Sequence, residues 1–319
     1  MNDAANVSRA RAWLIAARPH TLPAAAAPVL VGTGLALHDG VFAPLPALAA
    51  LLGAALIQVG TNFANDYYDA QTGADEDAGG FTRVTQSGLI PEERVRLAMV
   101  GAFGAAIALG TTLVYVGGVP ILVVGLASVA AGILYTGGPY PFGYYGLGDL
   151  FVFVFFGLVA VTGTYYVQAV TAMASVGPFP AWVPAGTIPA EAVVASLPMA
   201  ALITNILVVN NVRDLESDRA AGKYTLAVLI GYTWSRVEYV ALLALAYLVP
   251  VWFALRSGFG PPVLLPLLTL PFGVLVARTV LKHESEAALN PALERTGQLV
   301  AVYALLFAIG LSVSGMETL

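Results

Sequence analysis

The stretch QVGTNFANDYYDAQTGADEDAGGFTRVTQSG, residues 58–88, decides both the fold and the chemistry expected of this chain. It begins as the end of an apolar helix, continues into an acidic, glycine-rich loop and closes just after Arg83. Four polar residues recur at the spacing i, i+3, i+4 and i+7, which places them on one helical face: Asn62, Asn65, Asp66 and Asp69. Carboxylate and amide oxygens are the ligands that Mg²⁺ prefers, so this face is predicted to bind a divalent cation.

The composition around this stretch is that of a membrane protein. Of the 319 residues, 58% are hydrophobic and only 10% are charged, and the mean hydropathy is +0.81. Apolar runs of ~20 residues with almost no charge span a bilayer as helices. The absence of cysteine excludes disulfides, thiolate nucleophiles and Cys-ligated metals. The net charge of −5, with no basic patch, argues against a nucleic-acid partner.

We therefore expect an all-α, polytopic membrane protein in which a single domain, residues 1–319, is built from about nine transmembrane helices. A short amphipathic helix at the membrane surface is expected to precede them, and no cleaved signal peptide is recognised. The expected spans are about 21–37, 46–68, 95–116, 119–136, 148–170, 191–212, 235–255, 261–281 and 296–315. The boundary between the third and fourth spans rests on Gly117, Gly118 and Pro120.

The basic residues predict the orientation of these spans. If the N-terminus is cytoplasmic, all of the 14 Lys and Arg residues except Arg256 fall on the cytoplasmic side. Cytoplasmic loops retain Lys and Arg, so this bias supports both the orientation and the number of spans. The acidic residues, including Asp149, also fall at or just past the cytoplasmic ends of spans. We therefore expect an integral protein of the plasma membrane whose N-terminus and active site face the cytoplasm.

A second acidic stretch, NILVVNNVRDLESDRAAGKYTLA, closes the sixth expected span. Asn211, Asp214 and Asp218 share one helical face, and Arg219 and Lys223 follow. Four spans separate the two stretches, so both point the same way across the membrane. This pattern predicts a parallel repeat, with half-repeats at about 21–136 and 148–255 followed by helices at 261–315, around a central cavity open to the cytoplasmic side.

Two chemistries remain open for this cavity. Paired carboxylate clusters with nearby cations suit a Mg²⁺-bound diphosphate, because acids hold the metal and Arg or Lys neutralises the remaining phosphate oxygens. A single Asp at a helix end is more often a cap or a solvated loop residue, but two matched clusters favour the diphosphate site. A cation-coupled transporter also uses parallel repeats, yet it places ionisable residues near the bilayer midplane, and most spans here have none.

The two stretches resemble the aspartate-rich motifs of the UbiA superfamily of intramembrane prenyltransferases. The first motif, NDxxDxxxD, matches Asn65 to Asp69, with Gly73 where the third acid stands. The second, DxxDxxxD, matches residues 211–218, with Asn211 in place of the first acid. Within the superfamily, the segments 60–75, 83–90, 146–157 and 208–228 and the opening 18–32 are most similar to 1,4-dihydroxy-2-naphthoate prenyltransferases.

The resemblance implies an enzyme that transfers a polyprenyl group from polyprenyl diphosphate to 1,4-dihydroxy-2-naphthoate, releasing diphosphate and CO₂. It also leaves other acceptors open: 4-hydroxybenzoate, homogentisate, haem or a glycerol phosphate. Mg²⁺ is the implied cofactor, and its implied ligands are Asn65, Asp66, Asp69, Asn211, Asp214 and Asp218. The implied substrate-binding residues are Asn62, Asn65, Arg83, Asn211, Arg219 and Lys223. The family's Lys after a Tyr-Pro pair is absent, since Phe142 follows Pro141, so Arg83 and Lys223 are expected to carry that role.

The loop GGPYPFGYYGLGD, residues 137–149, is the expected site for the aromatic acceptor. Tyr140 and Tyr145 are expected to stack on the acceptor ring or on an allylic cation. Asp149 is expected to accept a phenolic proton as a catalytic residue. The alternative is an aromatic belt at the membrane interface with a capping aspartate.

Overall fold

The computed structural model describes residues 8–72 and 84–316, and within this part of the chain every regular element is a helix. The α-helices are α1 Arg9–Ala17, α2 Leu22–His38, α3 Pro44–Thr72, α4 Glu92–Leu134, α5 Gly148–Val152, α6 Ala160–Ala172, α7 Ala190–Arg213, α8 Leu215–Ala220, α9 Leu226–Ala254, α10 Leu270–Lys282 and α11 Glu286–Met316. Four shorter helical segments complete the set: η2 Pro19–Thr21, η3 Phe142–Tyr144, η4 Phe153–Val159 and η5 Pro261–Thr269.

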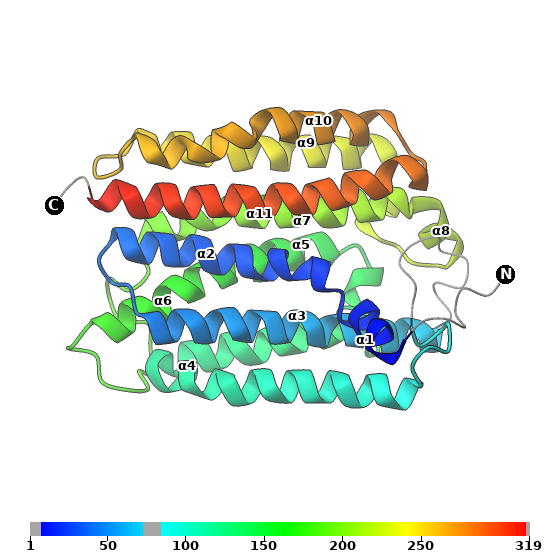
Figure 1. Ribbon diagram of the computed structural model, residues 1–319, viewed down its shortest axis with the longest axis horizontal. Helices are drawn as coiled ribbons and strands as arrows, with labels where there is room; N and C mark the ends of the chain where they lie inside the picture. The colour runs from blue at the N-terminus through cyan, green and yellow to red at the C-terminus, as the bar shows by residue number, and fades with distance from the viewer. Residues whose placement is uncertain (1–7, 73–83, 317–319) are drawn as a thin grey trace.

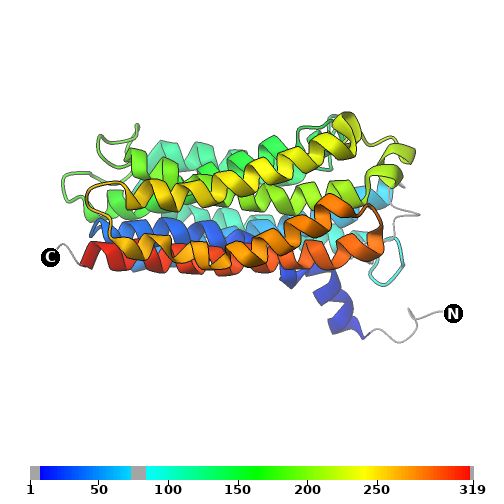
Figure 2. The same ribbon diagram turned by 90° about the horizontal axis from the view of Figure 1, so that it is seen from above.

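The long helices run side by side along one axis, as the two perpendicular views show (Figures 1 and 2). Eight helical stretches of the described residues are long and apolar enough to cross a membrane. Leucines and other large apolar side chains on their outer faces are exposed, as expected where lipid replaces water as the solvent. The predicted all-α, membrane-spanning architecture is confirmed.

Helix α4 explains why nine spans were expected although eight stretches qualify. At Gly118 its backbone leaves the helical region, with φ 65° and ψ −152°. A Cβ built at Gly132 would lie 3.3 Å from the ring of Phe103, whereas in an unbroken helix these residues would lie ~44 Å apart at ~1.5 Å per residue. Helix α4 is therefore two antiparallel arms, and they correspond to the expected third and fourth spans.

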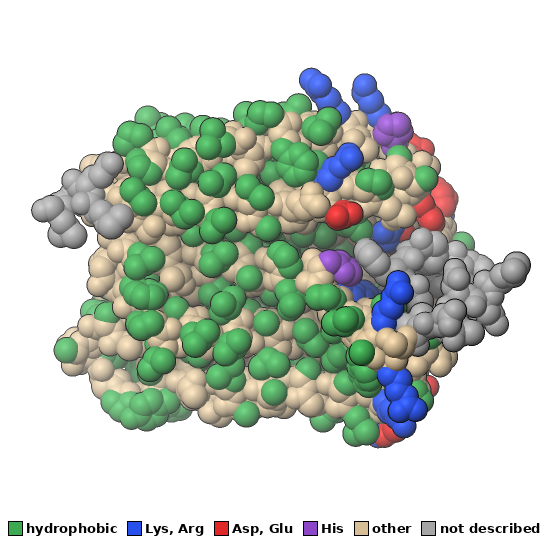
Figure 3. All heavy atoms as spheres, viewed as in Figure 1, with side chains coloured by type: hydrophobic (Ala, Val, Ile, Leu, Met, Phe, Trp, Pro, Cys, Tyr) green, Lys and Arg blue, Asp and Glu red, His purple; other side chains and the backbone are tan. Residues whose placement is uncertain are grey.

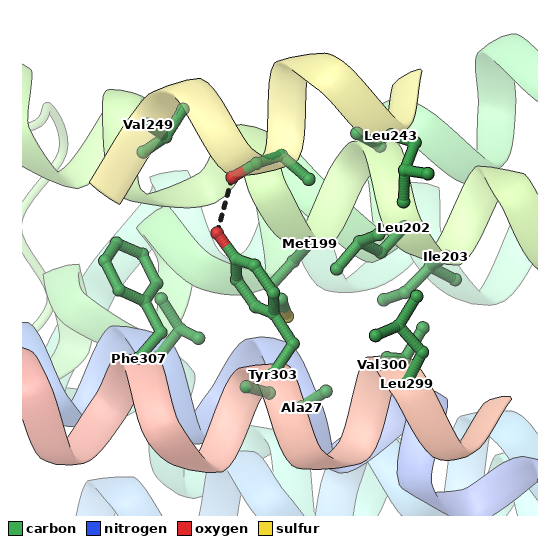
Figure 4. Packing of buried hydrophobic residues seen from close by; sticks show 14 of the residues in the cluster. Ala27, Met199, Leu202, Ile203, Leu243, Val249, Leu299, Val300, Tyr303 and Phe307 are labelled. Atoms are coloured by element: carbon green, nitrogen blue, oxygen red, sulfur yellow. Dashed lines mark hydrogen bonds between the residues drawn. The ribbon is translucent and has the colours of Figure 1, made fainter. Parts of the chain in front are cut away.

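In the second half of the chain, α7, α9 and α11 pack tightly against one another. Their core contains fully buried aromatic side chains, among them Tyr239, Phe253, Tyr303 and Phe307. The Tyr303 hydroxyl, pointing from α11 toward α9, donates to the carbonyl of Ala246, so the polar end of this ring is satisfied inside the core (Figure 4). Interdigitated packing of this kind leaves no room for a ligand, so the space for a substrate must lie elsewhere in the bundle.

Both acidic stretches lie at the same end of the bundle. Helices α1 and α8 mark this end in Figure 1, at the right. On the face seen in Figure 3, the charged side chains gather at this end and hydrophobic side chains cover most of the rest. The two stretches are far apart in the sequence, and the antiparallel packing of the long helices between them brings them to the same end of the bundle.

Candidate active site

Two acids of the first stretch are buried near the end of α3. Asp66 and Asp69 are each only 2% exposed. The Asp66 carboxylate accepts hydrogen bonds from the backbone amides of Val84 and Thr85, both at 3.1 Å, and from the Thr85 hydroxyl at 2.6 Å. These bonds compensate the desolvation of the carboxylate and fix the segment after residue 83 against α3.

The two asparagines of this helical face have different partners. The Asn62 amide nitrogen donates to the Ala17 carbonyl and the Thr21 hydroxyl, both at 2.9 Å, so it holds the junction between α1 and α2. The Asn65 side-chain oxygen accepts from Thr136 at 3.0 Å, at the start of the loop that follows α4. Asn62 therefore supports the wall of the site, while Asn65 lies beside the loop that follows α4.

Tyr144 connects the two acidic stretches. Its hydroxyl donates to Asp69 at 2.5 Å, and the Lys223 ammonium lies 5.1 Å from the centre of its ring. Lys223 in turn lies 3.9 Å from an Asp218 oxygen, and the Tyr144 carbonyl accepts from the Tyr224 amide. A single side chain of the 137–149 loop thus joins an acid on α3 to a cation–acid pair that follows α7.

Asp214, at the end of α7, is held by its neighbour Arg213. Two guanidinium nitrogens donate to the two carboxylate oxygens at 2.6 Å each. Arg213 is 7% exposed and also donates to Asn210 and, on α11, to Asn290, both at 3.0 Å. This two-point geometry fixes the orientation of Asp214 and ties the end of α7 to α11.

Tyr135 packs against the start of α5, where a Cβ built at Gly148, next to Asp149, would lie 3.2 Å from the Tyr135 hydroxyl. Asp149 is 5% exposed, and its Oδ2 atom has no hydrogen-bond partner in the described part of the chain. Burial, together with the negative charges of Asp149, Asp69 and Asp218, raises the pKa of the Tyr135 hydroxyl well above its ordinary value. Because Tyr135 also lines the cavity between α2, α3, α4 and α6, we take Tyr135 and Asp149 as the centre of the site.

A cavity of about 470 Å³ begins at this centre and continues between α2, α3, both arms of α4 and α6. Its polar end is formed by Gln58, Asn62, Asn65 and Tyr135, and the rest of its wall is apolar apart from a few hydroxyl side chains such as Thr111 and Ser128. Some of its lining residues, such as Ile107 and Leu126, are exposed on the outside of the bundle, so the cavity approaches the lipid-facing surface. A ligand with a charged head and a long hydrocarbon tail matches this arrangement.

Comparison with known proteins identifies the family. A profile described as the UbiA prenyltransferase family matches residues 25–301. The chain belongs to the UbiA prenyltransferase family. It is 39% identical to a 1,4-dihydroxy-2-naphthoate octaprenyltransferase of Escherichia coli strain K12, over 97% of each chain. It is 37% identical to the enzyme of the same name from Mycobacterium tuberculosis, over 93% of this chain and 95% of the relative.

Solved structures agree on the fold of this UbiA family member. A UbiA homologue from Aeropyrum pernix K1 aligns with a TM-score of 0.69 at 14% identity, over 94% of this chain and 98% of that one. A UbiA homologue from Archaeoglobus fulgidus, solved with DMAPP and Mg²⁺, aligns with a TM-score of 0.59 at 17% identity, over 93% and 99% of the chains. The resemblance inferred from the two acidic motifs is confirmed.

The donor atoms of the site are suited to a hard divalent cation, because they are carboxylate and amide oxygens. In the described part of the chain, no three acids or histidines converge into a cage that holds a metal by itself. Mg²⁺ is commonly bound by one or two carboxylates together with substrate phosphates, so an open set of acids fits a metal that arrives with a diphosphate. Buried Asp149 also keeps one oxygen without a hydrogen-bond partner in the described residues, so this atom is free to accept a further donor.

Three predicted contributors lie elsewhere than expected. Tyr140 and Tyr145 are 76% and 53% exposed and face each other, with ring centres 6.3 Å apart. Arg219 is exposed and pairs with Glu216 at 2.9 Å, away from the buried acids, because helical phase turns both outward. Asn211 is buried at 6% exposure, and Arg83 lies outside the described residues.

Roles for Tyr135 and Arg213 were not identified from the sequence, and neither was the hydrogen bond from Tyr144 to Asp69. Tyr144 directly precedes Tyr145, and only the turn of η3, Phe142–Tyr144, directs one ring inward and the other outward. Arg213 directly precedes a motif acid, and that adjacency was an available signal for an ion pair. Tyr135 follows an apolar span without any such signal.

Proposed function

We propose that this protein transfers a polyprenyl group from polyprenyl diphosphate to 1,4-dihydroxy-2-naphthoate, with Mg²⁺, in the plasma membrane. The observation that carries the proposal is the joining of a buried cluster of acids and Lys223 to a long apolar cavity. A diphosphate head at the cluster places the polyprenyl tail in the cavity. The choice of acceptor and of an octaprenyl donor is based on the names of the relatives.

In this proposal, Asp66, Asp69, Asp214 and Asp218, with Asn65 and Asn211, hold the metal. Bound Mg²⁺ supplies positive charge that stabilises the departing diphosphate, a charge that grows in the transition state. Lys223 and Arg83 neutralise the diphosphate oxygens that remain. Since the Tyr144 ring lies beneath Lys223, it orients the ammonium toward this head group.

The carbon–oxygen bond of the donor breaks, and a new carbon–carbon bond forms at the ring carbon that carries the carboxylate of the acceptor. The bond to the carboxylate then breaks, CO₂ leaves, and its electron pair restores the aromatic ring. Asp149 accepts the proton of an acceptor hydroxyl while the ring is attacked, and returns it afterwards. The apolar walls keep water from the allylic cation.

We further propose that the end of the bundle with the acids faces the cytoplasm. All but one of the Lys and Arg residues lie on this side if the N-terminus is cytoplasmic. Arg256, the exception, pairs with Glu191 at 2.7 Å at the start of α7, at the opposite end.

The test is turnover of purified protein with Mg²⁺, dihydroxynaphthoate and a labelled octaprenyl diphosphate. Diphosphate and prenylated product should appear together, and EDTA should abolish both. Parallel reactions with 4-hydroxybenzoate and homogentisate test the choice of acceptor. If no acceptor yields product in the presence of Mg²⁺, the proposal is wrong.

A further inference from the structure

Five glycines line the apolar cavity, and four of them, each on a different helical arm, face open space. Gly53 is on α3, Gly110 and Gly125 are on the first and second arms of α4, and Gly163 is on α6. A Cβ atom built at any of them would meet no other heavy atom within 4 Å. These positions therefore face empty space inside the bundle, and the packing of the helices does not require glycine there.

Gly157, and Gly132 as the fifth glycine of the cavity wall, behave differently. A Cβ at Gly157 would lie 2.1 Å from Ala200, and one at Gly132 would lie 2.5 Å from Thr61. Those glycines allow helices to approach closely, which is the usual reason for small residues in membrane helices. The other four cavity glycines instead leave the volume between the helices open.

The depth of these glycines separates them from the head-group site. Gly53 lies ~18 Å along α3 from Asn65, and Gly125 lies ~15 Å along α4 from Tyr135, at ~1.5 Å per residue. The hydroxyls near this depth bond within their own helices, Thr111 to Ala108 at 2.7 Å and Ser128 to Val124 at 2.8 Å. The middle of the cavity thus offers mainly hydrocarbon contacts to a ligand.

We propose that Gly53, Gly110, Gly125 and Gly163 determine the length of the polyprenyl tail that the enzyme accepts. The inference rests on the proposed function and assigns its donor specificity. A short tail ends before it reaches these positions, whereas a long tail passes them. A larger side chain at any one of them occupies the path of the long tail and leaves the site of the reaction intact.

The experiment compares Gly110→Leu with Gly104→Leu on the same arm of α4. A Cβ at Gly104 also meets nothing within 4 Å, but Gly104 does not line the cavity, so it is a matched control. The kcat/KM of each variant is measured with geranyl, geranylgeranyl and octaprenyl diphosphate. We expect the kcat/KM of Gly110→Leu to fall at least tenfold with the octaprenyl donor and little with the geranyl donor. For Gly104→Leu, the ratio of kcat/KM between the two donors should equal that of the wild type.

A second readout is independent of turnover. A donor that binds the folded protein raises its thermal unfolding temperature. We expect octaprenyl diphosphate to raise the Tm of the wild type, and to raise the Tm of Gly110→Leu and Gly163→Leu no more than geranyl diphosphate does. The Tm of each variant without donor shows that it is folded.

The two proposals fail in different ways. If the wild type turns over octaprenyl diphosphate and both cavity variants keep its donor ratio and its Tm response, the glycines do not select tail length and the proposed function stands. If the wild type makes no product with any donor, the proposed function is wrong. In that case loss of the octaprenyl Tm response in the cavity variants still supports a tail at these glycines.

Discussion

Each of four acids of the site, three of them buried and Asp214 partly buried, either accepts a hydrogen bond from a specific donor or has an oxygen without a partner in the described residues. Asp66 is bound by the Thr85 amide and hydroxyl, Asp69 by Tyr144 and Asp214 by Arg213. Asp149 alone among these four keeps a buried oxygen without a partner in the described residues. Charged groups are costly to bury unless they are hydrogen-bonded or paired, so these contacts hold the site together before any substrate binds.

Replacing Asp69 by Asn tests the role of its charge. The amide retains the size of the carboxylate but removes the negative charge proposed to hold Mg²⁺, so turnover should fall ~10²–10³-fold, as when other preorganised electrostatic groups are removed. Glu216→Gln is the matched control, because Glu216 belongs to the second motif but is exposed. Full turnover by Asp69→Asn at saturating Mg²⁺ would contradict the assignment.

Replacing Tyr144 by Phe tests the connection between the two clusters. The variant loses the 2.5 Å hydrogen bond to Asp69 and keeps the ring beneath Lys223. Loss of a hydrogen bond to a charged group costs ~1.5–3 kcal/mol, so kcat/KM should fall by about tenfold or more. Tyr145→Phe removes the hydroxyl of the exposed neighbour and should leave kcat/KM unchanged; equal losses in the two variants would rule out a specific role for Tyr144.

At the scale of elements, the break in α4 depends on one glycine. Gly118 has a φ of 65°, and a Cβ there would lie 1.9 Å from the Pro180 carbonyl oxygen. That oxygen also accepts a hydrogen bond from the Val119 amide at 3.0 Å. Pro120 follows and cannot donate to the helix. The turn between the two arms of α4 is therefore fixed both by backbone conformation and by the segment that packs onto it.

Gly118→Ala should consequently destabilise the protein. The substitution combines positive-φ strain of ~1–2 kcal/mol with a clash against backbone, so the total loss should exceed that strain alone. Gly101→Ala, in the helical first arm with open space around it, should be neutral or slightly stabilising. Thermal unfolding in detergent measures both, and an unchanged Tm for Gly118→Ala would contradict the described turn.

Helices α3 and α7 have matching roles, since each ends in an Asn/Asp cluster at the same end of the bundle. We propose that they are equivalent members of a parallel repeat. Their surroundings differ: α3 borders the cavity, whereas α7 packs against the aromatic core with α9 and α11. Helix α3 then borders the tail cavity, which α6 of the second half also lines, while α7 supplies a rigid support for the second cluster.

At the scale of the whole molecule, the position of the charges predicts the orientation in the membrane. The chain has no cysteine, so a single introduced thiol is the only one present. Ala221→Cys lies at the end with the acids and Gly177→Cys in the loop before α7, and both positions are exposed. In intact cells a membrane-impermeant maleimide should label Gly177→Cys and should label Ala221→Cys only after lysis; the reverse pattern would contradict a cytoplasmic site.

The sequence alone determined the class of fold, the number of membrane-crossing arms and the family. Apolar runs of the length of a bilayer and the i, i+3, i+4, i+7 spacing of Asn62 to Asp69 are local properties, and helices express them directly. The glycine and proline at 118 and 120 even indicated the division of α4. The chemical type of the site followed from residue types that recur in two stretches.

Only the tertiary structure decided which neighbouring side chains take part. Tyr144 points inward and Tyr145 outward, and Arg213 rather than Arg219 contacts Asp214. The space between α2, α3, α4 and α6 is open, whereas the space between α7, α9 and α11 is filled. Helical spacing specifies which residues share a face but not what that face meets. Those contacts arise from how α3, α7, α11 and the 137–149 loop pack together, and packing depends on residues far apart in the chain.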